Sequence, residues 1–204
     1  MGVYTVPSGS MKNTLLVGDV FVANKLAYGL RTPRWLGIPG TDFGMPIRSF
    51  TLIEGTPPDI GDVIVFRYPN NPSEIYVKRV IARGGDEFQI VQKRVLVNGD
   101  EIPMPPNGRF EFARFFEPGL IDPTIFPPGA GNSDNYGPVI VPEKHYFVLG
   151  DNRGSSADSR YWGYLPEELV LGKAEFIIFS RGMEMEEDEL VMQTRLERIG
   201  HWVY

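Results

Sequence analysis

Two short stretches carry residue types that could perform hydrolytic chemistry together. The stretch PSGSM (7–11) places Ser8 and Ser10 on either side of a glycine, in a turn followed by an apolar run. Such a Ser/Gly turn commonly serves only its own backbone hydrogen bonds. It can also present a serine hydroxyl as a nucleophile, provided that a base lies nearby. The identity of the base decides between these two interpretations.

A lysine is a better candidate for that base than a histidine. The chain has only two histidines, His145 and His201, too few and too scattered to favour a histidine-based triad. Lys78 lies in the middle of the strand-like stretch EIYVKRVIA, where alternation places it on the same face as Tyr76. Burial there would lower the pKa of the amine, and a neutral lysine can accept a proton from a serine hydroxyl. The alternative is an exposed lysine on an edge strand that prevents aggregation.

A third stretch, GDNRGSSADSRYWG (150–163), follows an apolar strand-like segment and concentrates hydroxyls and opposite charges. One interpretation is a polar loop with Asx and Ser turns. Alternatively, one of three serines could bond the lysine amine and orient it: Ser155, Ser156 or Ser159. The charged side chains of this stretch could form an ion-pair network together with Arg79; they are Asp151, Arg153, Asp158 and Arg160.

Composition excludes several classes of protein. The 204 residues carry a net charge of -6, which argues against a nucleic-acid-binding surface. Cysteine is absent, and two histidines are too few for a zinc site, so we expect no metal and no cofactor. No apolar run reaches the length of about 18 residues that a membrane-spanning helix needs.

The 23 glycines and 18 prolines, with short apolar runs, predict a mainly β protein with antiparallel sheets. We expect strands at 61–69, 74–82, 145–150 and 174–179, a hairpin at 91–102 that bends at Asn98-Gly99, a helical turn at 165–169, and a solvated acidic tail at 183–200. We expect a catalytic core formed by 1–88 and 143–204, an extended ribbon at about 31–60, and an inserted, irregular cap subdomain at 89–142.

Four blocks together resemble the type I signal peptidases, the bacterial leader peptidases of the serine–lysine class. They are PSGSMKNTLLVGD (7–19), GDVIVF (61–66), YVKRVIARGGD (76–86) and GDNRGSSADSRYWG (150–163), and they occur in the family's order. Two positions depart from the common pattern: Asn13, where many members have proline, and Gly154-Ser155, where many have an Asp-Asn pair.

The resemblance implies roles for individual residues. It makes Ser10 the nucleophile, Lys78 the general base, Ser8 an oxyanion-stabilising hydroxyl, and Ser156 the serine that orients the lysine. It assigns structural ion pairs to Arg79, Asp151, Asp158 and Arg160. The implied activity is cleavage of signal peptides from exported preproteins after small residues, at sites of the Ala-x-Ala type, through an acyl-enzyme.

Strand faces and the resemblance together predict the substrate pockets. The candidates for the pocket of the residue before the cleaved bond are Val6, Pro7, Met11, Leu15, Tyr76 and Val77. The candidates for the neighbouring pocket are Tyr4, Phe21 and Val65. The alternative for each is ordinary core packing.

The resemblance also implies the bacterial cytoplasmic membrane, with the catalytic domain on its outer face, and a lipid bilayer surface and preprotein signal peptides as partners. The chain given looks like a soluble truncation without N-terminal membrane segments. Candidates for an apolar edge facing the bilayer are Val3, Tyr4, Trp35, Leu36, Ile38 and Phe43.

Two other functions fit parts of the sequence. A self-cleaving, repressor-type serine–lysine protease would use the same chemistry, but no basic or helical DNA-binding segment precedes Ser10. A non-enzymatic, β-rich module that binds a membrane surface would need no nucleophile at all.

Overall fold

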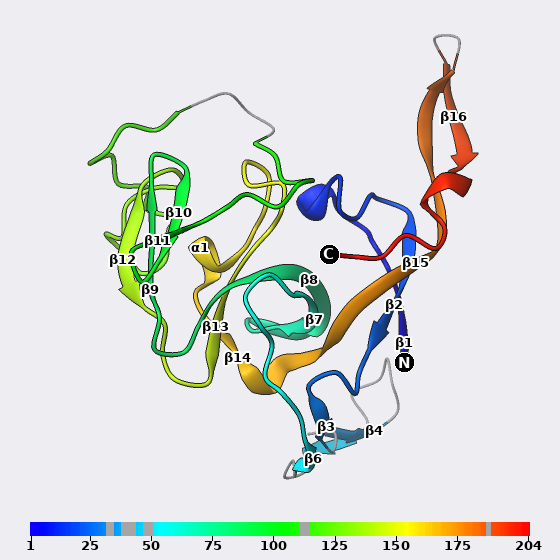
Figure 1. Cartoon of the computed structure of the whole chain (residues 1–204), viewed down its shortest axis with the longest axis horizontal. Helices are drawn as coiled ribbons and strands as arrows, with labels where there is room; N and C mark the ends of the chain where they lie inside the picture. Colours follow the sequence, from blue (N-terminus) through cyan, green and yellow to red (C-terminus); the bar gives the residue numbers. More distant parts are fainter. Residues whose placement is uncertain (32–34, 38–43, 47–50, 111–114, 187–188) are drawn as a thin grey trace.

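The computed structural model describes residues 1–31, 35–37, 44–46, 51–110, 115–186 and 189–204. The architecture is mainly antiparallel β, as the sequence predicts (Figure 1). Within the described part of the chain, the larger sheet runs in the order β1 (Gly2–Thr5), β2 (Asp19–Asn24), β15 (Val170–Glu186), β7 (Val63–Tyr68), β8 (Asn71–Arg83), β13 (His145–Leu149) and β14 (Leu165–Pro166).

The centre of this sheet is the β7–β8 hairpin. All four residues from Val63 to Phe66 are buried, as expected for an apolar run covered on both faces. Lys78 lies directly opposite Ile64 in the register of the two strands. The expected strand at 74–82 therefore forms, and it carries its lysine into the interior of the molecule.

A second sheet of four strands is drawn in green beside the first (Figure 1). Its order is β11 (Asp100–Ile102), β10 (Arg94–Val97), β9 (Glu87–Val91) and β12 (Tyr136–Ile140). The expected bend forms between Val97 and Asp100, where Asn98 and Gly99 both have positive φ, as a tight two-residue hairpin turn requires. The division of the chain into a core and an inserted cap stays a prediction.

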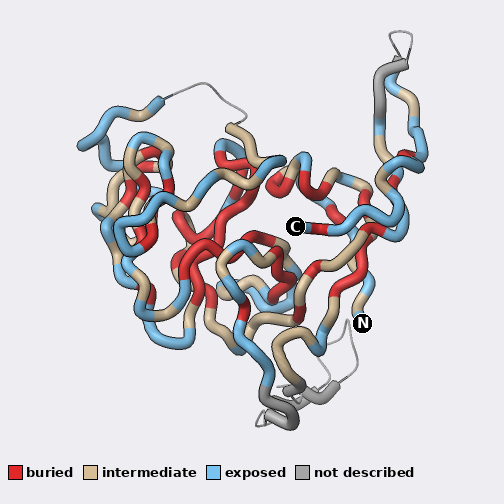
Figure 2. Tube along the Cα trace, in the orientation of Figure 1, coloured by how far each residue is buried: buried red, intermediate tan, exposed pale blue. Residues whose placement is uncertain are grey.

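The two sheets share one hydrophobic core. Phe147, on β13 of the larger sheet, stacks on Phe88 of the smaller sheet with ring centroids 3.9 Å apart, and it also contacts Tyr136. Buried residues are concentrated where β8 and β13 run past the second sheet (Figure 2). This core fixes the strand of Lys78 and the start of the 150–163 loop in one rigid body.

The described side chains of the tail are largely exposed, as the prediction of a solvated face requires, but the backbone there forms a hairpin that was not predicted. β15 extends to Glu186 and pairs with β16 (Glu189–Thr194), so that Met183 lies opposite Met192 in a hairpin that projects from the sheet (Figure 1). The acidic residues obscured the alternation of apolar positions that indicates a strand.

Short elements complete the chain. In the ribbon region, β3 (Gly29–Arg31) pairs with β6 (Thr51–Glu54), and β4 (Trp35–Gly37) pairs with β5 (Gly44–Pro46). The helical segments are η1 (Gly9–Met11), α1 (Ser159–Trp162), η2 (Glu167–Leu169) and η3 (Leu196–Arg198). The predicted helical turn at 165–169 is thus a short strand followed by a single 3₁₀ turn.

Phe147→Ala should lower the free energy of unfolding by about 3–5 kcal/mol, because it empties a fully buried position between two sheets. Urea denaturation followed by tryptophan fluorescence measures this. The matched control is Phe179→Ala, at a side chain that is 42% exposed and should cost far less. Equal losses for the two variants would contradict the shared core.

Candidate active site

The serine turn is built by η1 and the residues that follow it. Its backbone closes on itself because the N–H groups of Thr14 and Leu15 both donate to the carbonyl of Met11, at 3.1 and 2.7 Å. Asn13 has a φ of 77°, a left-handed conformation that asparagine tolerates and that proline cannot adopt. Ser10 ends up buried, whereas Ser8 is exposed.

Lys78 reaches this turn from β8. Its Nζ donates to Ser10 Oγ at 2.8 Å and to the carbonyl of Val77 at 2.9 Å, and the residue is only 4% exposed. Burial lowers the pKa of Lys78 to about 8, although Asp158 and Asp151 act in the opposite direction. A substantial fraction of this amine is therefore neutral in mildly alkaline solution, in hydrogen-bond contact with a serine hydroxyl.

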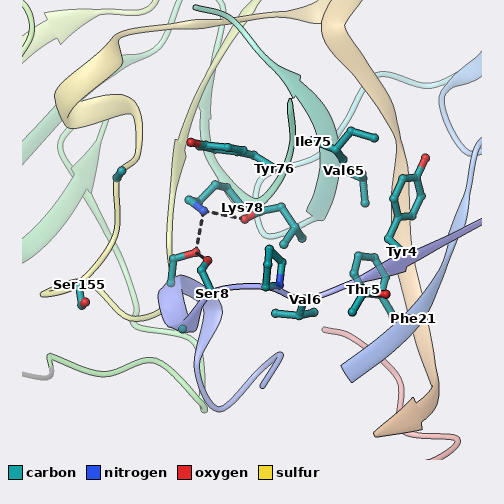
Figure 3. Close-up of a pocket in the computed structure, with 15 residues that line it drawn as sticks. Tyr4, Thr5, Val6, Ser8, Phe21, Val65, Ile75, Tyr76, Lys78 and Ser155 are labelled. Atoms are coloured by element: carbon teal, nitrogen blue, oxygen red, sulfur yellow. Dashed lines mark hydrogen bonds between the residues drawn. The ribbon is translucent and has the colours of Figure 1, made fainter. Parts of the chain in front are cut away.

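A cavity of about 480 Å³ opens over this pair. Figure 3 shows Lys78 between Ser8 and Tyr76, with Tyr4, Val65 and Phe21 toward one end and Ser155 at the other. Seven predicted pocket residues line the cavity: Tyr4, Val6, Pro7, Phe21, Val65, Tyr76 and Val77. The remaining residues of the lining, which the sequence did not point to as pocket residues, are Thr5, Gly9, Ile75, Ser155 and Ala157.

Met11 and Leu15 do not line the cavity. Both are fully buried in the core with Val6 and Phe21. In an irregular turn, apolar residues have no fixed period, so sequence alone could not distinguish the cavity wall from the core beneath it.

The predicted charged residues form two buried pairs. Arg79 contacts both oxygens of the Asp151 carboxylate, at 2.8 and 2.6 Å. Asp158 and Arg160 pair at 2.8 Å, and although burial opposes the effect, this arginine holds the pKa of Asp158 below its ordinary value. Arg153 is also buried, and burial together with the nearby Arg160 lowers the pKa of its guanidinium to about 10.

The other predicted serines lie in three different environments. Ser8 Oγ is 3.4 Å from Ser10 Oγ, on the cavity wall. Ser159 Oγ accepts from the N–H of Val148 at 3.0 Å, which ties that hydroxyl to the sheet. Ser156 Oγ is buried beside the Asp158 carboxylate, whose pKa it helps to lower, and the bonds of Lys78 given above do not include it.

Three residues of the site escaped the sequence analysis: Thr14, Gly150 and Asn152. Thr14 Oγ1 donates to Asp151 at 2.5 Å, which ties the serine turn to the 150–163 loop. Asn152 donates to the carbonyls of Gly9 and Ser10. A Cβ on Gly150 would lie 2.2 Å from Ser156 Oγ and 2.5 Å from the carbonyl oxygen of Ser10, so this position requires glycine.

Comparison with known proteins identifies the class of enzyme. A sequence model of the family described as "Signal peptidase, peptidase S26" matches residues 1–179. Signal peptidase I of Pseudomonas fluorescens is 33% identical over 219 residues, which cover 97% of this chain and 70% of the relative. Signal peptidase I of Aquifex aeolicus is 32% identical over 219 residues, and the alignment covers 88% of this chain and 75% of the relative. A crystal structure of a signal peptidase I from Enterococcus faecalis aligns with a TM-score of 0.41 at 28% identity, covering 58% of this chain and 97% of that one.

These matches define the class as a serine peptidase of the S26 type. Within it, the chain belongs to the signal peptidase I family. It is an enzyme that cleaves signal peptides from secreted preproteins, in a family that is membrane-anchored. In the described part of the chain, no helix has the length and apolar character to cross a membrane.

Gly150→Ala should lower kcat for signal-peptide cleavage by roughly 100-fold, because the added methyl group must displace either Ser156 or the Ser10 backbone. Steady-state kinetics on a signal-peptide substrate measure the loss, and circular dichroism checks that the variant is folded. A folded variant with unchanged kcat would show that the turn tolerates displacement at this point.

Proposed function

We propose that Ser10 is the nucleophile of this signal peptidase and that Lys78 is its general base. The observation that carries the proposal is the 2.8 Å contact between Lys78 Nζ and Ser10 Oγ, in a buried setting at the floor of the cavity. A base must lie within hydrogen-bond reach of the proton that it removes and should have a pKa near the working pH. The lowered pKa of Lys78 satisfies the second condition.

In this mechanism Ser10 Oγ attacks the carbonyl carbon of the scissile peptide bond while neutral Lys78 takes the hydroxyl proton. The resulting oxyanion accepts hydrogen bonds from the N–H of Ser10 and from the hydroxyl of Ser8. The C–N bond then breaks, the Lys78 ammonium gives its proton to the leaving amine, and an acyl-enzyme remains. Lys78 next activates a water that hydrolyses the ester. One oxyanion donor of this kind lowers the barrier by about 3 kcal/mol.

Ser156 has a supporting part in the proposal. A lysine ammonium has three donors, and two of those of Lys78 are directed at Ser10 Oγ and Val77 O. The buried hydroxyl of Ser156 can donate to the Asp158 carboxylate and still accept the third donor of the charged amine. Ser156 would thereby keep the lone pair of the neutral amine aimed at the nucleophile.

The cavity favours small residues before the cleaved bond. Its wall next to Ser10 is formed by Val6, Pro7 and Val77, with the stacked rings of Tyr4 and Phe21 toward the far end. A single cavity lined by apolar side chains along its length suits sites of the Ala-x-Ala type, in which two small residues enter it. We place the first small residue over Val6 and Val77, and the other over Phe21 and Val65.

We further propose that cleavage takes place at the bilayer surface, on the outer face of the bacterial cytoplasmic membrane. Support comes from the membrane-anchored family and from the exposed apolar side chain of Val3, next to cavity-lining Tyr4. Ile38 and Phe43 lie outside the described residues, and so do the side chains of Trp35 and Leu36.

The activity should rise with pH through a single ionisation near pH 8, because only the neutral form of Lys78 accepts the serine proton. The pH profile of kcat/KM on a signal-peptide substrate measures this ionisation in the free enzyme. Ser10→Ala and Lys78→Met should both abolish cleavage. A profile that is flat across this range, or cleavage by Ser10→Ala, would contradict the assignment.

The protein should co-sediment with phosphatidylcholine vesicles through the edge that carries β1. Val3→Ser should weaken this binding because it removes exposed apolar surface from that edge, and Trp35→Ser tests whether the ribbon region also takes part. Ile140→Ser is the control, because this side chain is 59% exposed on β12 of the other sheet. Equal binding by all of the variants would assign attachment to other parts of the protein.

A further inference from the structure

Asn152 holds both peptide groups that adjoin Ser10. Its side-chain Nδ2 donates to the carbonyl of Gly9 at 3.1 Å, and its backbone N–H donates to the carbonyl of Ser10 at 3.0 Å. The residue is only 1% exposed. The first of these carbonyls belongs to the peptide group that also contains the N–H of Ser10.

The geometry of a peptide group links these two atoms. In a planar trans peptide, the C=O and the N–H point in opposite directions. Because the carbonyl of Gly9 faces Asn152, the N–H of Ser10 faces away from it. No acceptor among the described residues takes that N–H, and both Gly9 and Ser10 line the cavity.

The turn itself restrains this peptide group only weakly. Gly9 has no side chain, and a Cβ built there would meet nothing within 4 Å. Rotation of a peptide next to glycine is sterically inexpensive. Within the turn, the carbonyl of Gly9 has one further donor, the N–H of Lys12 at 3.0 Å. The external restraint therefore comes from the amide of Asn152.

We propose that Asn152 is a positioning residue that orients the Gly9–Ser10 peptide so that the N–H of Ser10 is directed at the oxyanion. The inference rests on the proposed function of Ser10 as the nucleophile. Asn152 does not touch the reacting atoms. It acts through the backbone, and its effect is confined to states in which the substrate carbonyl oxygen carries negative charge.

The test asks whether Asn152→Ala weakens binding of the transition state while leaving binding of the uncleaved substrate unchanged. We expect kcat to fall roughly 10- to 100-fold, with KM and the midpoint of the pH profile nearly unchanged. The affinity for a peptide aldehyde should fall by the same factor, because its adduct with Ser10 carries an oxyanion. Binding of the uncleaved peptide, measured with Ser10→Ala in the background, should not change.

Two further variants sharpen the result. Asn152→Asp should lose more activity than Asn152→Ala, because a carboxylate cannot donate to the carbonyl of Gly9 and repels it. Asn152→Ser keeps a small polar group that is too short to reach that carbonyl, and it supplies the measurement if Asn152→Ala fails to fold.

The matched control is Asn132→Ala. Asn132 is also buried and also donates its amide to two carbonyls, those of Glu117 and Leu120, but it lies outside the cavity lining. Its substitution should lower the thermal midpoint and leave kcat intact. The proposal is overturned if Asn152→Ala behaves like this control, or if its KM rises while the aldehyde affinity stays normal.

Different results would contradict the role of Ser10 as the nucleophile and the role of Asn152 as a positioning residue. If Ser10→Ala still cleaves substrate, the proposed function is wrong. If Ser10→Ala is inactive while folded Asn152 variants have normal kcat, only the role of Asn152 is wrong.

Discussion

The buried carboxylate of Asp151 joins the three parts of the chain that make the site. It accepts from Arg79, which follows Lys78 on β8, and from Thr14, which follows the serine turn. Its side chain is fully buried and that of Arg79 is 7% exposed, so removing either partner would leave an uncompensated charge in the interior. The distance between the serine hydroxyl and the lysine amine therefore depends on this ion pair, even though neither of its members reaches the cavity.

The same cluster sets the electrostatics of the lysine. Desolvation alone disfavours the ammonium, and the carboxylates of Asp158 and Asp151 oppose that effect. Both carboxylates are themselves paired with arginines, which reduces their pull on the lysine proton. The balance leaves the pKa of Lys78 at about 8, low enough for a neutral amine and high enough for that amine to remain a useful base.

The features of the site that could be predicted from the sequence are those formed by residues close together in the chain. A lysine within an apolar strand and two serines around a glycine are visible without a structure, and so is the mainly β architecture. Thr14 and Asn152 escaped because their partners lie 137 and 143 residues away, and a bond to a distant atom has no local pattern. Met11 and Leu15 were wrongly placed on the cavity wall, because an irregular turn has no period that separates wall from core.

The glycine in the serine turn explains why these distant bonds are needed. A residue without a side chain leaves open space at Gly9, on the cavity wall where a substrate backbone can approach closely. The same freedom would let the neighbouring peptide rotate. Glycine therefore leaves room for the substrate but makes the turn less rigid. The bonds from Thr14 to Asp151 and from Asn152 to Gly9 hold the turn in place. The geometry around Ser10 is accordingly a property of the whole fold. It forms only when the 150–163 loop packs against the serine turn and makes these bonds.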